Sequence, residues 1–328
     1  MTRDLRLDIL RVLSILAVIL IRITAVYETS DTFHFDKLSS WIVSVIHRSL
    51  FWSVPVLFMV SGALLLDNRN ESTEFFYKKR MSKVLIPTLF WSVFFLMYLY
   101  IFEDYTLFNL AGVFVKSGAF DHLWFMYAII GLYVFTPYFR VFLQHLSIGE
   151  IKKLIIILFI FTILNNILSQ YFENEGTIFS FFIGYIGYFF LGHYLYKNRD
   201  SFIKYSHLYG VIFFSLVFFS SVADIIREHY FHIDISIFTI FLPLQAITLY
   251  LFLLNTQVTF KLSSNLWINL SIFSFGTYLV HAVFILVFEP YMTMNDLLYL
   301  PLFYLLVLVC SYIFVYTLSK IKYLKSII

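Results

Sequence analysis

Long apolar stretches separated by short polar segments recur along the whole chain. A helix of about 20 apolar residues is long enough to cross the hydrocarbon core of a bilayer. We therefore expect an all-α integral membrane protein, a bundle of about ten transmembrane helices that forms one membrane domain over residues 1–328. The predicted spans cover residues 9–27, 41–66, 84–103, 122–142, 152–170, 177–196, 207–225, 236–255, 271–289 and 299–319.

Composition supports this class. Hydrophobic residues make up 61% of the chain and charged residues only 13%, and the mean hydropathy is +0.85, whereas soluble domains are about one quarter charged. The 41 Phe and 24 Tyr suit lipid-facing helices with aromatic belts. Cys310 is the one cysteine, so no internal disulfide can form. The net charge of +3 is too small to suggest a nucleic-acid partner.

The distribution of Lys and Arg predicts the orientation. If both termini are cytoplasmic, eighteen basic residues fall on the inside and only Lys37, Lys116 and Arg227 on the outside, with Arg22 and Arg48 within the membrane. Cytoplasmic loops carry an excess of basic residues, so the pattern indicates a multi-pass protein of the inner, cytoplasmic membrane. The inside set is Arg3, Arg6, Arg11, Arg69, Lys78, Lys79, Arg80, Lys83, Arg140, Lys152, Lys153, Lys197, Arg199, Lys204, Lys261, Lys320, Lys322 and Lys325.

The first span has basic residues before an apolar run, as a signal peptide does. The nine further spans, and an arginine inside that run, favour an uncleaved signal anchor instead. We find no linker, low-complexity tract or internal repeat, and the missing repeat counts against the repeat-built transporter folds.

Two arginines mark one face of this first span. Arg11 and Arg22 are eleven residues apart, so they share a helix face and are separated by about 16 Å along the axis. Asp8 lies three residues before Arg11, so the two side chains can pair at the cytoplasmic end of the helix. In the alternative without a functional role, Arg11 simply extends to the lipid headgroups and pairs with Asp8 there. A guanidinium as deep as that of Arg22 is costly, which favours a polar site.

Several motifs, in order along the chain, resemble acyltransferase family 3, whose first helix typically reads Leu-Arg, ten residues, then His. Here Leu10-Arg11 matches and Arg22 holds the histidine position. The other matching motifs are Val54-Pro55-Val56-Leu57-Phe58-Met59-Val60-Ser61-Gly62-Ala63-Leu64-Leu65, Phe76-Tyr77-Lys78-Lys79-Arg80 with Ile86-Pro87 and Trp91, His122-Leu123-Trp124-Phe125-Met126-Tyr127 with Leu132-Tyr133 and Thr136-Pro137, and Ser274-Phe275-Gly276-Thr277-Tyr278-Leu279-Val280-His281.

The resemblance implies transfer of an acyl group, usually acetyl, from cytoplasmic acyl-CoA as co-substrate to a hydroxyl of a bacterial cell-envelope glycan. No metal is expected. The chemistry needs a base near the acceptor hydroxyl, donors for the developing oxyanion and cations for the CoA phosphates. Arg11 is a candidate for the CoA phosphates because its donor fork matches their oxygens. The predicted cytoplasmic cluster of Lys78, Lys79, Arg80 and Lys83 could meet CoA or anionic lipid.

His281 is the second catalytic candidate, because it is an ionisable group in mid-membrane that matches the family's Tyr-Leu-x-His; it could instead bond a neighbouring helix. Arg48 has no acid nearby in its span, so Glu289 or an acceptor sugar could pair with it. Further candidates for the acceptor cavity are Ser61, His122, Trp124, Tyr127, Tyr133 and Tyr278. Gly62 is better explained by close helix packing.

Arg22 is the main departure from the family pattern. An imidazole can take and return a proton near neutral pH, whereas a guanidinium stays protonated. If the first helix carries the catalytic histidine, this chain is expected to be inactive or impaired. His281 could in principle supply a base, and Arg22 could still hold an anionic ligand.

Two other classes of function stay open. Many helices and an internal arginine also suit a transporter of polysaccharide or lipid-linked sugar, and Arg22 suits a non-catalytic binding protein. Dependence on CoA distinguishes the enzyme from the transporter. The sequence does not identify the acceptor, the acyl chain or the oligomeric state.

Overall fold

A computed structural model describes residues 3–29, 38–67, 71–172, 177–231, 236, 238–256, 264–291, 297 and 299–328, and every regular element in these ranges is helical. Eight helices or helix pairs are long and apolar enough to cross a membrane, which confirms the all-α membrane class. Lys37, Arg69 and Lys261, used above for orientation, lie outside the described residues. The placement of both termini in the cytoplasm stays a prediction.

The chain divides into two compact units, and each is described by itself. Unit 1 comprises Met1–Leu57, Asn198–Lys322 and Ile328. Unit 2 comprises Phe58–Lys197 and Tyr323–Ile327.

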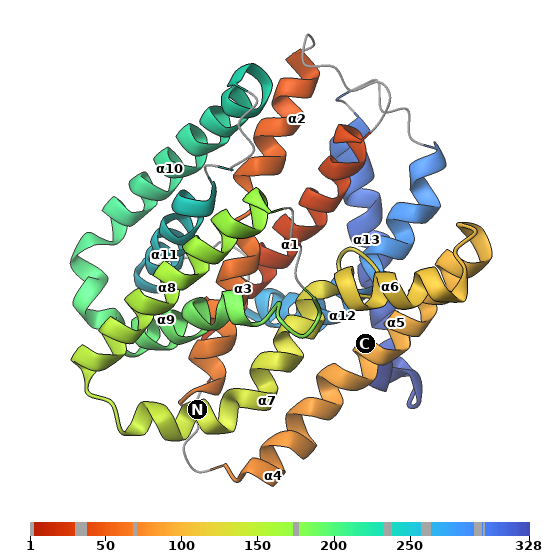
Figure 1. Cartoon of the computed structure of the whole chain (residues 1–328). Helices are drawn as coiled ribbons and strands as arrows, with labels where there is room; N and C mark the ends of the chain where they lie inside the picture. Colours follow the sequence, from red (N-terminus) through yellow and green to blue (C-terminus); the bar gives the residue numbers. More distant parts are fainter. Residues whose placement is uncertain are drawn as a thin grey trace. The chain divides into compact units, whose positions relative to one another are not determined.

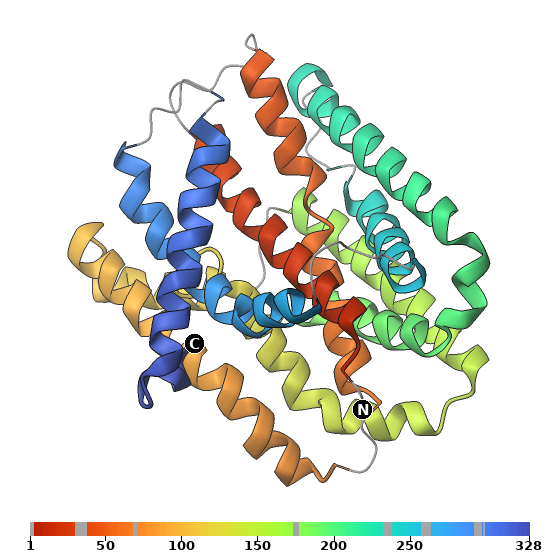
Figure 2. The same cartoon turned by 180° about the vertical axis from the view of Figure 1, so that it is seen from behind.

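Unit 1 is built around the first helix, α1. This helix begins after Asp4, whose side chain accepts a hydrogen bond from the Arg6 amide and so satisfies one of the free donors of the first turn. In this unit α1 packs against α2, α11, α12 and α13, and α10 packs along α11 (Figures 1 and 2). Its helices are α1 (Leu5–Glu28), α2 (Leu38–Ser49), α10 (Ser206–Ile226), α11 (Phe238–Asn255), α12 (Ser264–Phe288) and α13 (Tyr299–Lys320).

A short turn at residues 50–52 separates α2 from the next helix, α3 (Ser53–Leu65), within the predicted span 41–66. Arg48 therefore lies in the last turn of α2, next to this break. Helix α3 crosses from unit 1 into unit 2 along the sequence.

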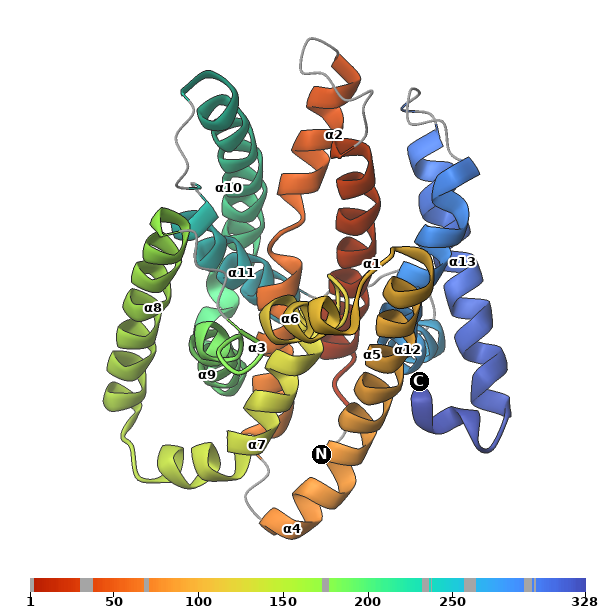
Figure 3. The ribbon, with the colours of Figure 1, turned by 45° about the vertical axis from the view of Figure 1, so that its right-hand side comes forward.

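Unit 2 contains α4, a π-helical turn and α5 as one continuous rod (Figure 3). Ser72 begins this rod by accepting a hydrogen bond from the Phe75 amide. Gly118, with φ of 82°, ends α6 in a conformation that favours glycine. The helices are α4 (Thr73–Phe76), the π turn Tyr77–Met81, α5 (Ser82–Phe102), α6 (Leu107–Ser117), α7 (Trp124–Gln144), α8 (Ile148–Tyr171) and α9 (Ile186–Lys197).

Helices α3 and α9 approach each other very closely in unit 2. A Cβ atom at Gly62 would overlap the backbone carbonyl of Phe189, and one at Gly192 would overlap the backbone of Met59. Small residues permit such contacts between membrane helices. The packing interpretation of Gly62 is therefore the one that the structure supports.

Besides the break at residues 50–52, the helices depart from the predicted spans at two places. The span 177–196 is helical as α9 only from Ile186, and its 12 residues rise about 18 Å. Before it, the Ser180 side chain accepts from the Thr177 amide and donates to the Thr177 carbonyl, local bonds that compete with a helix. Helix α6 was not among the predicted spans because it is short and partly polar.

Candidate functional site

Asp8 is the centre of a polar group at the start of α1. Its buried carboxylate accepts hydrogen bonds from Arg3 Nε at 2.6 Å and from the Ser271 hydroxyl of α12 at 2.6 Å. Arg11 lies 3.6 Å from the same carboxylate and donates to Ser271 at 3.1 Å. The predicted pairing of Asp8 with Arg11 is therefore present, and it also joins α1 to α12.

A second carboxylate, that of Asp4, lies at the same end of unit 1. It pairs with Arg6 at 3.1 Å and with Arg199 at 3.0 Å, while Arg6 also donates to the Leu254 carbonyl at 2.8 Å. Arg199 also lies 3.9 Å from Asp200. Four guanidinium groups therefore share three carboxylates, and the Arg11 side chain is 31% exposed.

Arg22 lies about three quarters of the way along α1 and is partly buried. Its charge interacts electrostatically with two histidines, His281 on α12 and His47 on α2. Arg22, a permanent cation, thus stands where the family's first-helix histidine is expected. A histidine acts on it from each of two helices that pack against α1: His47 from α2 and His281 from α12.

His281 is completely buried. Its Nδ1 lies 2.5 Å from the carbonyl oxygen of Tyr278, one turn earlier in α12, and the two rings are 5.7 Å apart. A carbonyl can only accept, so Nδ1 carries the hydrogen, and Nε2 is the nitrogen that has the lone pair in the neutral ring. The structure thus brings the two predicted catalytic residues, Arg22 and His281, into one unit and one electrostatic environment.

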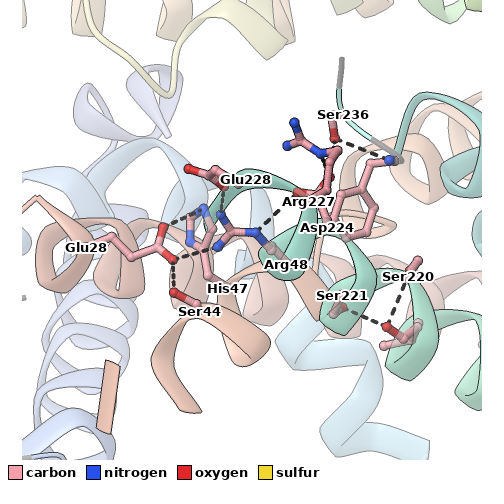
Figure 4. Close-up of polar contacts among 12 residues, drawn as sticks. Glu28, Ser44, His47, Arg48, Ser220, Ser221, Asp224, Arg227, Glu228 and Ser236 are labelled. Carbon is pink, nitrogen blue, oxygen red and sulfur yellow. Dashed lines mark hydrogen bonds and ion pairs between the residues drawn. The ribbon is translucent and has the colours of Figure 1, made fainter. Parts of the chain in front are cut away.

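Arg48 is the buried centre of a charged cluster that joins three helices (Figure 4). Its guanidinium donates to Glu28 at 2.9 Å, to Asp224 at 3.3 Å and to Glu228. The hypothesis that Glu289 pairs with Arg48 is wrong, because acids from α1, from α10 and from the π turn Arg227–Phe231 after α10 converge on it instead. We call Glu28, Ser44, His47, Arg48, Asp224 and Glu228 the Arg48 cluster.

His47 is a member of this cluster that the sequence analysis missed. Its Nδ1 lies 2.9 Å from the Thr24 hydroxyl of α1, and its Nε2 lies 3.6 Å from a carboxylate oxygen of Glu28. A signal was present, since His47 is an ionisable residue inside the predicted span 41–66. Its contact with Glu28 could not be predicted, because the sequence does not define how the segment between Glu28 and His47 brings the two residues together.

Unit 2 has a second charged group, around Arg140 of α7. Arg140 is 5% exposed; its Nε donates to the Leu65 carbonyl at 2.7 Å, and its other nitrogens lie 3.3 Å from Glu71. Lys79 lies 3.7 Å from the same carboxylate, and the charge of Arg80 acts on Arg140. We call Glu71, Lys79, Arg80 and Arg140 the Arg140 cluster. The sequence analysis placed Arg140 in the cytoplasmic set and did not identify this buried role.

The predicted CoA-binding residues thus fall in both units. Arg11 belongs to unit 1, whereas Lys78, Lys79, Arg80 and Lys83 lie on the π turn and the start of α5 in unit 2. The three lysines are exposed and Arg80 is partly buried. Their joint action on one ligand stays a prediction.

The remaining cavity candidates are divided in the same way. Tyr278 is buried in unit 1. In unit 2, Ser61 is partly buried beside Gly62, and His122 packs edge-on against Phe95 with ring centroids 5.1 Å apart. Trp124 stacks on Tyr185, and the Tyr127 hydroxyl lies 2.7 Å from that of Ser92. The ring centroid of Tyr133 lies 6.1 Å from that of Phe76. The prediction that His122, Tyr127 and Tyr133 line one cavity with His281 stays a prediction.

These features define a multi-pass helical membrane protein with charged clusters inside its helical units. A family model described as an acyltransferase domain, that of acyltransferase family 3, matches residues 4–316. The chain therefore belongs to acyltransferase family 3. The comparisons with curated proteins and with solved structures find no match.

Proposed function

We propose that this protein transfers an acyl group, acetyl in the first instance, from cytoplasmic acyl-CoA to a hydroxyl of a cell-surface glycan or its lipid-linked precursor. The observation that carries the proposal is the family match over residues 4–316. A membrane acyltransferase needs an acyl donor and an acceptor, and CoA thioesters supply an activated acyl group for the ester that forms.

The cations of the two units support the CoA part of the proposal. Arg11 is anchored by Asp8 and Ser271 yet remains 31% exposed, so it can turn donors toward phosphate oxygens. Lys78, Lys79 and Lys83 are exposed where the π turn meets α5, and they attract anions through solvent.

Arg22 determines the expected rate. Because a guanidinium does not give up its proton, residue 22 supplies no general base in this chain. General acid–base catalysis contributes about 10²–10⁴-fold to a rate. We therefore propose a functional acyltransferase scaffold whose turnover is far below that of a variant with histidine at this position.

The test is transfer of labelled acetyl from acetyl-CoA to mixed surface-glycan fragments by purified protein in liposomes. Arg22→His is expected to raise the rate by about 100-fold, and both proteins are expected to bind acetyl-CoA. Equal rates for both proteins contradict the role given to Arg22. If neither protein binds acetyl-CoA nor transfers acetyl, the acyltransferase proposal fails.

A second candidate is a non-catalytic binding protein, which the permanent cation at Arg22 favours. It predicts binding of acetyl-CoA without transfer by either protein. Movement of labelled glycan across the liposome membrane without CoA would instead indicate a transporter.

A further inference from the structure

His47 and Glu28 form a histidine–carboxylate pair near Arg22, the position at which the family pattern has a histidine. Helix α2 places His47 against α1, where its Nδ1 lies 2.9 Å from the Thr24 hydroxyl. The Thr24 hydroxyl lies 2.9 Å from two backbone carbonyls, those of Leu20 and Ile21. Because that hydroxyl donates to carbonyls, it accepts from His47, so Nδ1 carries the hydrogen and Nε2 has the lone pair of the neutral ring.

The carboxylate of Glu28 is held so that one oxygen is directed at this nitrogen. Its Oε1 accepts from the Ser44 hydroxyl at 2.7 Å and from Arg48 at 2.9 Å. Its Oε2 lies 3.6 Å from His47 Nε2. A proton taken by Nε2 is thus placed directly beside a negative charge, and the imidazolium that forms is stabilised.

The charges that face His47 come from every helix packed against it. On α1 these are Arg22, a cation, and Glu28, an anion. On α2 the neighbour is Arg48, and Asp224 of α10 and Glu228 of the π turn that follows α10 reach the same guanidinium. Asp224 and Glu228 also pair with Arg48, and Glu28 is shared, with Oε1 on Arg48 and Oε2 3.6 Å from His47 Nε2.

The two histidines beside Arg22 therefore differ. His281 has its Nδ1 on a backbone carbonyl and is completely buried. His47 has a similarly defined tautomer, a carboxylate within ion-pair distance and a side chain that is 14% exposed. A general base becomes positively charged during the reaction, and a neighbouring carboxylate stabilises that charge, so the surroundings of His47 suit a base better than those of His281.

We propose that His47, with Glu28 as its counter-charge, is the general base that this chain uses in place of a first-helix histidine. The inference rests on the proposed function. The acceptor hydroxyl oxygen attacks the thioester carbonyl carbon while its proton passes to His47 Nε2. The new C–O bond forms, the C–S bond breaks, and the proton returns from Nε2 to the departing CoA sulfur. His47 is thus a catalytic residue, and Glu28 is a positioning residue.

The test uses the full chain in liposomes, with labelled acetyl-CoA and mixed surface-glycan fragments. His47→Gln is expected to lower the transfer rate by at least about 100-fold while the affinity for acetyl-CoA is retained. His207→Gln is the matched control, because His207 is an exposed histidine of the same unit, and it is expected to leave the rate unchanged. Added imidazole is expected to restore part of the rate to His47→Ala, which a purely structural role of His47 would not allow.

A double variant separates this inference from the proposed function. Arg22→His/His47→Gln is expected to transfer acetyl, because the base has returned to α1. A transfer rate of His47→Gln within about threefold of that of the unaltered chain overturns the role of His47. The role is also overturned if His47→Ala binds acetyl-CoA but its transfer rate does not rise when imidazole is added. An unaltered chain that transfers nothing while Arg22→His transfers also overturns it and leaves the proposed function standing. Absence of both binding and transfer in all variants overturns both.

Discussion

The Arg48 cluster and the Arg140 cluster each surround a buried arginine, but they have opposite charge balances. Around Arg48, three carboxylates meet two guanidinium groups, those of Arg48 and Arg227, and a histidine lies beside the acids. Around Arg140, one carboxylate meets two cations, and the charge of Arg80 is close by. The acid-rich group can stabilise a transient cation, whereas the cation-rich group can stabilise an anion.

The difference has a consequence for the proposed reaction, because its two substrates are chemically unlike. CoA carries phosphates, which suit the cation-rich group and the exposed lysines beside it. An acceptor hydroxyl carries no charge and needs a group that takes its proton, which suits the pair of His47 and Glu28.

Replacing Arg48 should give the largest effect on stability. Arg48→Met leaves Glu28 without its arginine partner and leaves Asp224 with only Arg227, 3.0 Å away, and breaking a buried ion pair typically costs about 3–5 kcal/mol. Thermal unfolding in detergent micelles measures the loss, with Arg227→Met, at the edge of the same group, as a milder comparison. A melting temperature within error of the unaltered protein would show that the carboxylates are protonated or solvated.

Arg140→Gln should be less damaging. The variant loses the bond to the Leu65 carbonyl and the pair with Glu71, but it leaves only one carboxylate uncompensated and Lys79 is 3.7 Å from it. We expect a loss of about 2 kcal/mol in the free energy of unfolding. The same melting experiment checks this value, and a loss that exceeds that of Arg48→Met would reverse the comparison between the clusters.

Neutralising the exposed lysines should affect ligand binding more than folding. Lys78→Gln and Lys83→Gln are each expected to weaken acetyl-CoA binding by about fivefold at low salt, the size of effect that one basic residue has on an anionic surface. Binding titrations at two salt concentrations measure it, and the difference should shrink at high salt because salt screens exposed charges. Lys320→Gln, in unit 1, is the control. Affinities that do not change would remove the lysines from the CoA site.

Glu228→Gln should have the smallest effect. Its side chain is 52% exposed, and the other two carboxylates remain on Arg48. Exposed ion pairs contribute between about 0 and 1 kcal/mol, so the melting temperature should fall only slightly. A fall as large as that of Arg48→Met would mean that all three acids are needed to hold the arginine.

The sequence by itself determined the class of this protein and the helices of most of its spans. A run of about 20 apolar residues must satisfy its backbone hydrogen bonds internally in lipid, so hydropathy is enough to predict where α1, α5, α7, α8, α10, α12 and α13 lie. The motifs around Arg11, Ser61, Trp124 and His281 were enough to predict the family. Asp8 and Arg11 were also predicted as a pair, because they are three residues apart on one helix.

Only the tertiary structure decided which polar groups meet. Glu28, Arg48 and Asp224 are far apart in the chain and come from three helices, so no spacing rule connects them. For the same reason His47 and Arg140 were passed over and Glu289 was wrongly considered. Hydropathy records which residues avoid water, whereas the pairing of buried charges depends on which helix faces are packed together, and that is a property of the fold.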